Sequence, residues 1–398
     1  MTDKIKHIPQ GYKDSPLGII PKEWEVKKLG EICTHFKSGF TITAREISNT
    51  GLYPVYGGNG LRGYCPKYTH DGNYILIGRQ GALCGNINYV TGKNYISEHA
   101  IAVQTYENMQ WLRYKLENWN LNRFSESSAQ PGLSVEKLVR YKLIVPPRNE
   151  QVIIANVLQL WDTAMEKQSE LIEKLKLRKR ALMQQLLTGK KRLPGFSGEW
   201  KRKKLGDIAE RVTRKNEEDN KNVVTISAQR GFVIQTDFSN KSVASETLDN
   251  YYLIHKDEFC YNKSYSNGYP MGAIKRLTAF DKAVVTTLYI CFKLKNLSTI
   301  NIDFFEQYCE SGIFNKELVK IANEGGRAHG LLNVTPTDFF NMQMKIPNIE
   351  EQNAIATVLV NADKEIELVN EKLASLQSQK RGLMQQLLTG KKRIKNIE

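Results

Sequence analysis

Loops that mix basic, amide and aromatic side chains with glycine occur in two separate regions of the sequence. Arginine, lysine, asparagine and glutamine can read base edges through paired hydrogen bonds, and serine and tyrosine commonly bind phosphates. Neighbouring glycines let a backbone approach a duplex closely. Each loop alone could equally be a solvated turn, but their occurrence in both regions predicts DNA contact by Asn59, Arg62, Tyr64, Arg79 and Gln80 in the first region, and by Gln229, Arg230, Asn262, Lys263, Ser264, Tyr265, Asn267, Lys275 and Arg276 in the second.

The charge of the chain favours the same kind of partner. Its 398 residues carry 57 Lys and Arg against 42 Asp and Glu, a formal net charge of +15. Such a balance suggests a polyanion, although an acidic protein partner or simple solubility would also fit. Short basic runs add candidate phosphate contacts at Lys190, Lys191, Arg192, Lys201, Lys203 and Lys204, with a solvated surface as the alternative.

Patterns that would indicate catalysis are incomplete. Residues 58–63 fit a Gly-x-Gly-x-x-Gly pattern, but the Tyr-Cys-Pro that follows cannot open the helix of a dinucleotide site. Residues 188–192 lack the upstream glycine and the Ser or Thr of a P-loop. The six histidines are scattered and the six cysteines lie far apart, so neither a metal site nor a disulfide framework is indicated. We therefore predict no catalytic residue and no metal site.

The chain contains an internal repeat. Lys179–Arg192 returns as Lys380–Arg393 with thirteen of fourteen positions identical, and Glu150-Gln151 returns as Glu351-Gln352, both 201 residues later. Glu23-Trp24 returns as Glu199-Trp200 at an offset of 176, so the second copy is about 25 residues longer. Residues 33–145 and 209–345 differ from each other. A shared frame that presents two different readers is the simplest interpretation.

Each repeated segment carries an apolar stripe with a period of 3.5 residues. Such a stripe, between proline ahead and glycine behind, predicts a helix of about 38 residues and a coiled coil. The two matched helices would pair with each other, antiparallel and related by a pseudo-twofold axis. Lys179 and Lys380 interrupt the stripe, either to fix the register or because the helix end is exposed there. The predicted seam consists of Leu158, Trp161, Met165, Ile172, Leu175, Leu182, Leu359, Ile366, Val369, Leu373, Leu376 and Leu383.

These features define an α+β fold with two globular α/β domains in tandem. The predicted divisions are residues 1–148 for the N-terminal segment and first domain, 149–192 for the first helix, 193–348 for the second domain and 349–398 for the second helix. Strand-like runs lie at 74–77, 100–103, 223–226 and 284–292. No run reaches the roughly 20 apolar residues of a membrane span, and no signal peptide is visible, so we expect a cytoplasmic protein without a membrane partner.

The whole chain resembles the specificity subunit of type I restriction-modification enzymes. The resemblance rests on the repeated Leu-Met-Gln-Gln-Leu-Leu-Thr-Gly-Lys-Lys-Arg ending, the Glu-Trp openings and the Glu-Gln-x-x-Ile-Ala helix starts. It implies two target-recognition domains that each read one half of a split site in double-stranded DNA, with the helices setting the spacing. It also implies docking of two methyltransferase subunits, joined by restriction subunits in the full complex of this bacterial defence system. S-adenosylmethionine, ATP and Mg²⁺ would bind those partners, and this chain would hold no cofactor.

Two other classes of protein remain as alternatives at this point. A single-chain methyltransferase or nuclease would need additional length for a cofactor-binding core. A structural adaptor would use the basic surface to bind an acidic protein. DNA binding that depends on sequence separates the first interpretation from both.

Overall fold

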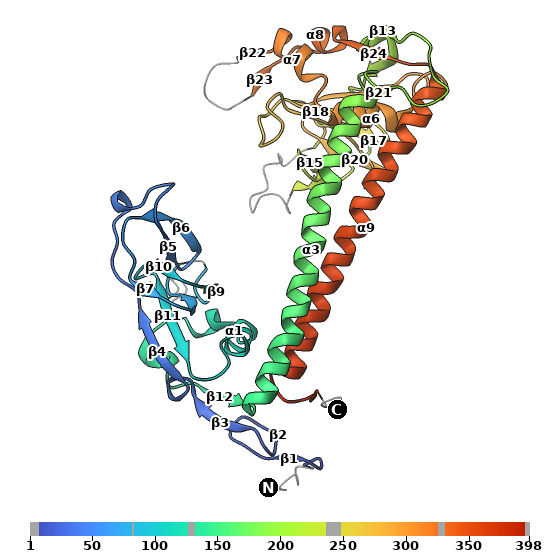
Figure 1. Cartoon of the computed structure of the whole chain (residues 1–398). Coiled ribbons are helices and arrows are strands. Elements are labelled where there is room, and N and C mark those ends of the chain that lie inside the picture. The colour runs from blue at the N-terminus through green and yellow to red at the C-terminus, as the bar shows by residue number, and fades with distance from the viewer. Residues whose placement is uncertain (1–7, 82, 126–131, 236–247, 325–330, 395–398) are drawn as a thin grey trace. The chain divides into compact units, whose positions relative to one another are not determined.

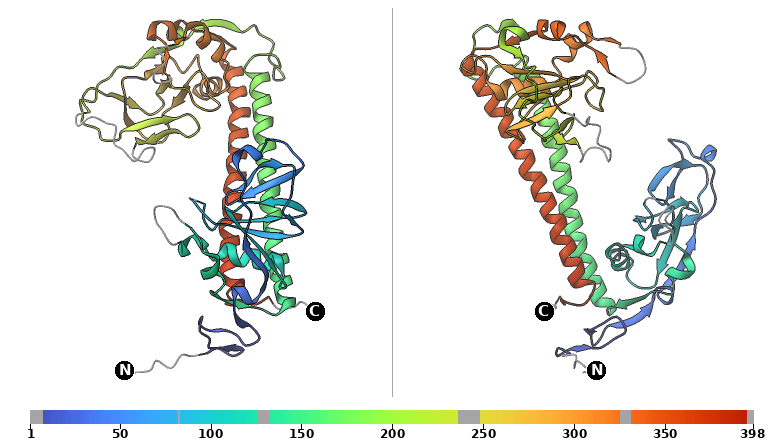
Figure 2. Two further views of the ribbon diagram at one scale, coloured as in Figure 1. Left: turned by 90° about the vertical axis from the view of Figure 1, so that its left-hand side faces the viewer. Right: turned by 180° about the vertical axis from the view of Figure 1, so that it is seen from behind.

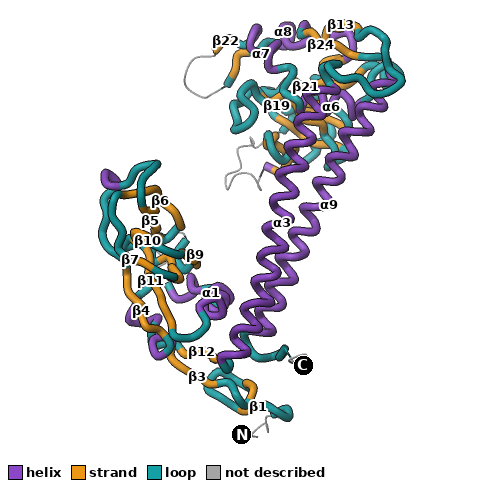
Figure 3. The backbone as a smooth tube through the Cα atoms, viewed as in Figure 1, coloured by secondary structure: helices purple, strands orange, loops and turns teal. Residues whose placement is uncertain are grey.

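A computed structural model describes residues 8–81, 83–125, 132–235, 248–324 and 331–394 (Figure 1). The chain divides into two compact units: the first unit comprises Met1–Ser169 with Glu371–Glu398, and the second comprises Glu170–Asn370. Each unit holds one globular domain and a share of both long helices, α3 (Arg148–Leu186) and α9 (Ile349–Leu387). Figure 3 shows the strands gathered in the globular domains. No helix in the described ranges is long and apolar enough to cross a membrane.

The first globular domain contains two four-stranded sheets, ordered β6-β5-β10-β7 and β4-β11-β8-β9. Successive side chains of a strand point to opposite faces of the sheet, and both faces of β8 and β11 carry buried side chains. Ile75 and Ile101 belong to a core shared with the helices, whereas Leu76 and Ala102 belong to a second cluster. The elements are β1 (Tyr12–Lys13), β2 (Ile20–Pro21), β3 (Glu25–Lys28), β4 (Cys33–Ser38), β5 (Tyr53–Gly57), β6 (Gly60–Cys65), β7 (His70–Asp71), β8 (Tyr74–Gly78), β9 (Ile87–Val90), β10 (Lys93–Ile96), β11 (Ala100–Thr105), α1 (Met109–Asn118), α2 (Val135–Leu138) and β12 (Lys142–Val145).

The second globular domain has one four-stranded sheet, ordered β14-β21-β18-β19, and several two-stranded sheets. The predicted strand at 284–292 is two strands, because a turn in which Tyr289 N–H donates to Thr286 O separates β20 from β21. The elements are β13 (Lys201–Lys204), α4 (Leu205–Ile208), β14 (Ala209–Arg211), β15 (Val224–Ser227), β16 (Gly231–Ile234), β17 (Tyr252–His255), β18 (Phe259–Asn262), β19 (Ala273–Arg276), β20 (Lys282–Val285), β21 (Ile290–Leu294), α6 (Ile302–Glu310), α7 (Asn315–Ile321), β22 (Asn323–Glu324), β23 (Leu332–Asn333), α8 (Pro336–Asn341) and β24 (Gln343–Ile346).

The long helices end as their sequences predict. Each has 39 residues. Gly189 and Gly390 follow them in the left-handed region, with φ of 71° and 72°. Beyond these glycines the chain turns back, and the N–H groups of Lys191 and Lys392 donate to the carbonyls of Gln185 and Gln386 at 3.1 and 3.2 Å. These bonds satisfy carbonyls that the helix leaves open at its C-terminus.

Within each unit the two helices pack antiparallel (Figures 1 and 2). In the first unit, Leu158 near the start of α3 shares a buried core with Met384 and Leu387 near the end of α9. In the second unit, Leu359 near the start of α9 shares a core with Leu186 near the end of α3. All twelve predicted seam residues are buried or half-buried.

Ion pairs between the helices replace the apolar contact where lysines interrupt the stripe. Lys380 Nζ lies 2.5 Å from Asp162 Oδ1 in the first unit, and Lys179 Nζ lies 2.5 Å from Asp363 Oδ1 in the second. The two pairs correspond, since both partners are shifted by 201 residues. The lysine side chains are only 11% and 15% exposed. They are therefore interhelical partners and not exposed helix ends.

Candidate nucleic-acid interface

Three loops of the first unit meet at Gly58. They follow β5, β8 and β10, and the parallel pairing of β10 with β5 brings two of them together. Ser97 N–H donates to Tyr56 O at 2.8 Å, and Arg79 N–H donates to His99 O at 2.9 Å. A Cβ on Gly58 would lie 2.8 Å from His99 O and 3.3 Å from Gly78 Cα, so a side chain there would push the loops apart.

The structure brings four of the five predicted residues of this domain to the meeting point. Asn59, Arg62 and Gln80 are exposed, and Arg79 is half-buried. The stem of Arg62 covers Gly57, whose ideal Cβ would lie 2.7 Å from Arg62 Cδ. Tyr64 lies two residues further along β6, in a bridge with Ser48. The predicted contacts of all five with DNA remain predictions.

Residues 97–99, between β10 and β11, join this group and were not among the sequence candidates. His99 Nδ1 lies 3.1 Å from Gln80 Oε1, and His99 Nε2 lies 3.5 Å from Glu98 Oε1. Ser97 is fully buried. A polar Ser-Glu-His run directly before the buried run of β11 is the sequence signal that could have identified them.

The second unit also presents exposed polar loops. Gln229 and Arg230 form the exposed turn between β15 and β16, and Gln229 Nε2 donates to Asn267 O at 2.9 Å. Tyr265 is 67% exposed, so its ring is available for stacking or phosphate contact. Asn262 has a local role, because its Oδ1 accepts from Ser264 N at 3.1 Å.

Of the basic side chains predicted to contact DNA in this unit, two are held in ion pairs and a third is half-buried. Lys275 Nζ lies 2.5 Å from Glu310 Oε1, and Arg276 pairs with Asp257, Asp303 and Glu306. Lys263 is half-buried, and burial, followed by the charge of Arg211, lowers the pKa of its amine. Contact of Lys275 or Arg276 with DNA would require these ion pairs to open.

The predicted phosphate contacts of the second unit also include both exposed side chains and one that is held in an ion pair. Lys190, Lys191, Lys201 and Lys203 are exposed, as phosphate contacts would require. Lys204 is exposed too, with Nζ 3.3 Å from Asn341 Oδ1. Arg192 differs, because its guanidinium binds both oxygens of Glu351 at 2.5 and 2.6 Å, which commits it to a structural contact.

That arginine belongs to a cluster that occurs once in each unit. In the second unit, Glu351 also accepts from Trp200 Nε1 at 3.2 Å. In the first unit, Glu150 accepts from Trp24 Nε1 at 2.9 Å and from Arg393 at 3.0 and 3.1 Å. Each cluster joins the opening of a domain, the start of one long helix and the end of the other. The sequence marked these residues as repeated but did not show that they touch.

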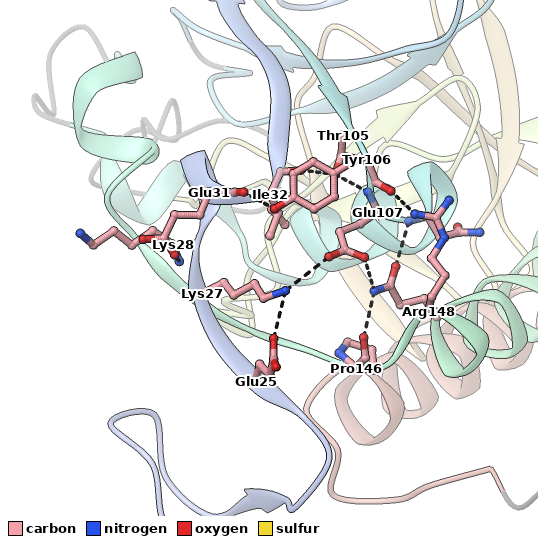
Figure 4. A network of polar contacts seen from close by, with 12 residues as sticks. Glu25, Lys27, Lys28, Glu31, Ile32, Thr105, Tyr106, Glu107, Pro146 and Arg148 are labelled. Atoms are coloured by element: carbon pink, nitrogen blue, oxygen red, sulfur yellow. Dashed lines mark hydrogen bonds and ion pairs between the residues drawn. The ribbon is translucent and has the colours of Figure 1, made fainter.

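A polar network ties the start of α3 to the sheet that contains β8 and β11 in the first unit (Figure 4). Glu107, just after β11, accepts from Gln151 Nε2 at 2.7 Å and lies 3.8 Å from Lys27 Nζ. The Arg148 guanidinium donates to Tyr106 O. Because β11 continues from the loop of residues 97–99, the helix and the loop are linked through one strand.

The fold and the loops define a duplicated protein: two α+β domains in tandem, each with exposed polar loops, share a repeated helical frame. The chain belongs to the family described as the type I restriction modification DNA specificity domain, which matches residues 21–177 and 197–378. It is therefore a type I restriction-modification specificity subunit with two recognition domains. This confirms the family, the fold class and the DNA-binding role expected from the sequence.

Known relatives match this chain over different lengths. The EcoprrI specificity subunit of Escherichia coli is 42% identical over 160 residues, which are 38% of this chain and 40% of that protein, so the chain matches less than half of that relative. The MjaVIII specificity subunit of Methanocaldococcus jannaschii is 23% identical over 418 residues, 95% of each chain. The crystal structure of the S subunit from M. genitalium has the same fold, with a TM-score of 0.56 and 17% identity over 92% of this chain and 96% of that one.

Proposed function

We propose that each recognition domain reads one half of a bipartite site in double-stranded DNA and that the paired helices set the distance between the halves. One observation carries the proposal: the contacts that join domain to helix are repeated, while the loops differ. The Trp–Glu–Arg clusters and the Lys–Asp pairs recur with the helix residues shifted by 201. The loops at Asn59, Arg79, Gln229 and Tyr265 have no such counterpart. A constant frame with different loops suits two different half-sites.

The same helices are the proposed docking surface for two methyltransferase subunits, with restriction subunits joining the full complex. Two matching copies of one frame offer two similar surfaces, which suits two copies of one partner. In this proposal the chain is not catalytic. S-adenosylmethionine, ATP and Mg²⁺ bind the partner subunits, which methylate adenine and cleave DNA.

Binding of the purified complex to duplexes with two randomised half-sites tests the proposal. We expect selection of two different short sequences at a fixed separation. Methylome sequencing of the host with and without the gene should then show adenine methylation at that site only when the gene is present. Binding that is independent of sequence would refute the reading function, and methyl transfer by this chain alone would refute the division of labour.

A further inference from the structure

Glu98 lies where the three loops of the first unit meet, and its carboxylate is incompletely satisfied. In the described part of the chain its Oε2 is buried without a hydrogen-bond partner, and its Oε1 has one ion-pair contact, with His99 Nε2 at 3.5 Å. Among the described residues, neither lysine nor arginine pairs with it. The side chain is nevertheless 30% exposed, so the carboxylate can turn toward solvent. A carboxylate in this state gains free energy from any donor that reaches it.

Two further unpaired polar atoms border the same loops. Ser97 Oγ lies 3.4 Å from the position of a Cβ on Gly57, and Asn88 lies beside Gly60, with its Nδ2 unpaired. The described ranges contain six buried side-chain polar atoms without a hydrogen-bond partner, and three of them border these loops. Buried polar groups are rarely left unpaired in folded proteins. Their concentration indicates a surface that a polar ligand completes.

The chemistry of that ligand follows from the charges. Arg62 and Arg79 attract phosphate groups, whereas Glu98 repels them and accepts hydrogen bonds only. In the major groove the donors are the exocyclic amino groups, N4 of cytosine and N6 of adenine, while guanine and thymine present acceptors at the corresponding positions. A carboxylate therefore favours cytosine or adenine and repels the other two bases.

We propose that Glu98 is a specificity-determining residue of the first recognition domain and accepts a hydrogen bond from the amino group of one cytosine or adenine in its half-site. This rests on the proposed reading function. His99 is a positioning residue in the proposal: it lies between Glu98 and Gln80, whose Oε1 is 3.1 Å from His99 Nδ1. The two side chains then read neighbouring positions from one connected group.

The test compares Glu98→Gln with the unchanged chain, each in complex with the methyltransferase subunits of its own system. Gel-shift selection from a duplex library randomised in both half-sites measures base preference at every position. We expect one position in one half-site to select cytosine or adenine, and the base selected identifies the donor. Glutamine presents an amide donor as well as an acceptor, so the preference there should fall about tenfold in Glu98→Gln. All other positions should keep their preferences.

Glu25→Gln is the matched control, because it makes the same charge change in the same unit. Glu25 is on β3, is not part of the three loops, and pairs with Lys27 at 3.0 Å. The inference is overturned if Glu98→Gln leaves every preference unchanged, or if the position it alters selects guanine or thymine in the unchanged complex. A complex of the unchanged chain without any sequence preference would instead refute the proposed function. Retained selection at the other half-site shows that the variant is folded.

Discussion

The lysine–aspartate pairs between the helices predict a measurable coupling energy. The test uses the single variants Lys380→Met and Asp162→Asn and the double variant that combines them. Asparagine keeps an acceptor for the Tyr114 hydroxyl, which donates to Asp162 Oδ2 at 2.5 Å. The double-mutant cycle therefore isolates the charge pair from the neighbouring hydrogen bond.

The magnitude follows from exposure. In the first unit the Lys380 side chain is 11% exposed and the Asp162 side chain 27% exposed. A fully exposed ion pair contributes up to about 1 kcal/mol, and breaking a fully buried one costs several kcal/mol. Because this pair lies between the two cases, we expect a coupling energy of about 2 kcal/mol. In the second unit Asp363 is 45% exposed at the same 2.5 Å distance from Lys179. Stronger solvent screening there should reduce the coupling of Lys179→Met with Asp363→Asn to about 1 kcal/mol.

Hydrogen exchange read by mass spectrometry on peptides of α3 and α9 is the suitable assay, because it reports local opening in a protein with two units. Lys372→Met is the control: Lys372 is exposed on α9, so this variant should change the opening free energy by less than about 0.5 kcal/mol. Zero coupling in the first unit, or a larger coupling in the second than in the first, would refute the reasoning.

Three further predictions concern recognition, spacing and pH. Arg79→Ala should relax base preference in one half-site only, measured by selection from a randomised library; uniform weakening would instead assign Arg79 to a phosphate. Inserting one heptad into both 154–186 and 355–387 lengthens the helices by about 10 Å and should widen the gap by about three base pairs, measured by methylome sequencing; an unchanged gap would exclude the helices as the ruler. Burial lowers the pKa of Lys115 from 10.5 to about 8, so the unfolded chain binds more protons between these values and stability should rise with pH across that window. Lys115→Met should remove this rise, measured by urea unfolding at pH 7.5 and pH 9.5, and an identical rise in both proteins would contradict the assignment.

The helices and their seam could be predicted because their signals are local. The 3.5-residue period placed Leu158 and Leu359 on the buried face, and Gly189 and Gly390 marked the ends. Strand order could not be predicted in this way. The parallel pairing of β10 with β5 joins segments about 40 residues apart and leaves no mark in either strand's own pattern.

The candidate site was predictable only in part, for a related reason. Glycine-rich polar loops identified Asn59 and Arg79, but Glu98 becomes a candidate only when its missing partners are known. Conversely, the sequence did not show that Lys275 pairs with Glu310 of α6. Whether a charge faces solvent or a buried counter-ion depends on contacts distant in the sequence.

The first unit combines two segments that are distant in the sequence, and this has a consequence for protein synthesis. Its core includes Met384, Leu387 and Leu388, and Lys115 Nζ donates to Leu388 O at 2.6 Å, so the N-terminal domain needs the last residues of α9. The second unit is one continuous stretch, Glu170–Asn370. During synthesis the second unit can thus complete its core first, because the first unit still lacks Met384, Leu387 and Leu388 when residue 370 has been added. A chain that stops before the final turns of α9 would lack Met384, Leu387 and Leu388, and the core of its N-terminal domain would stay incomplete even though the second unit has all of its own residues.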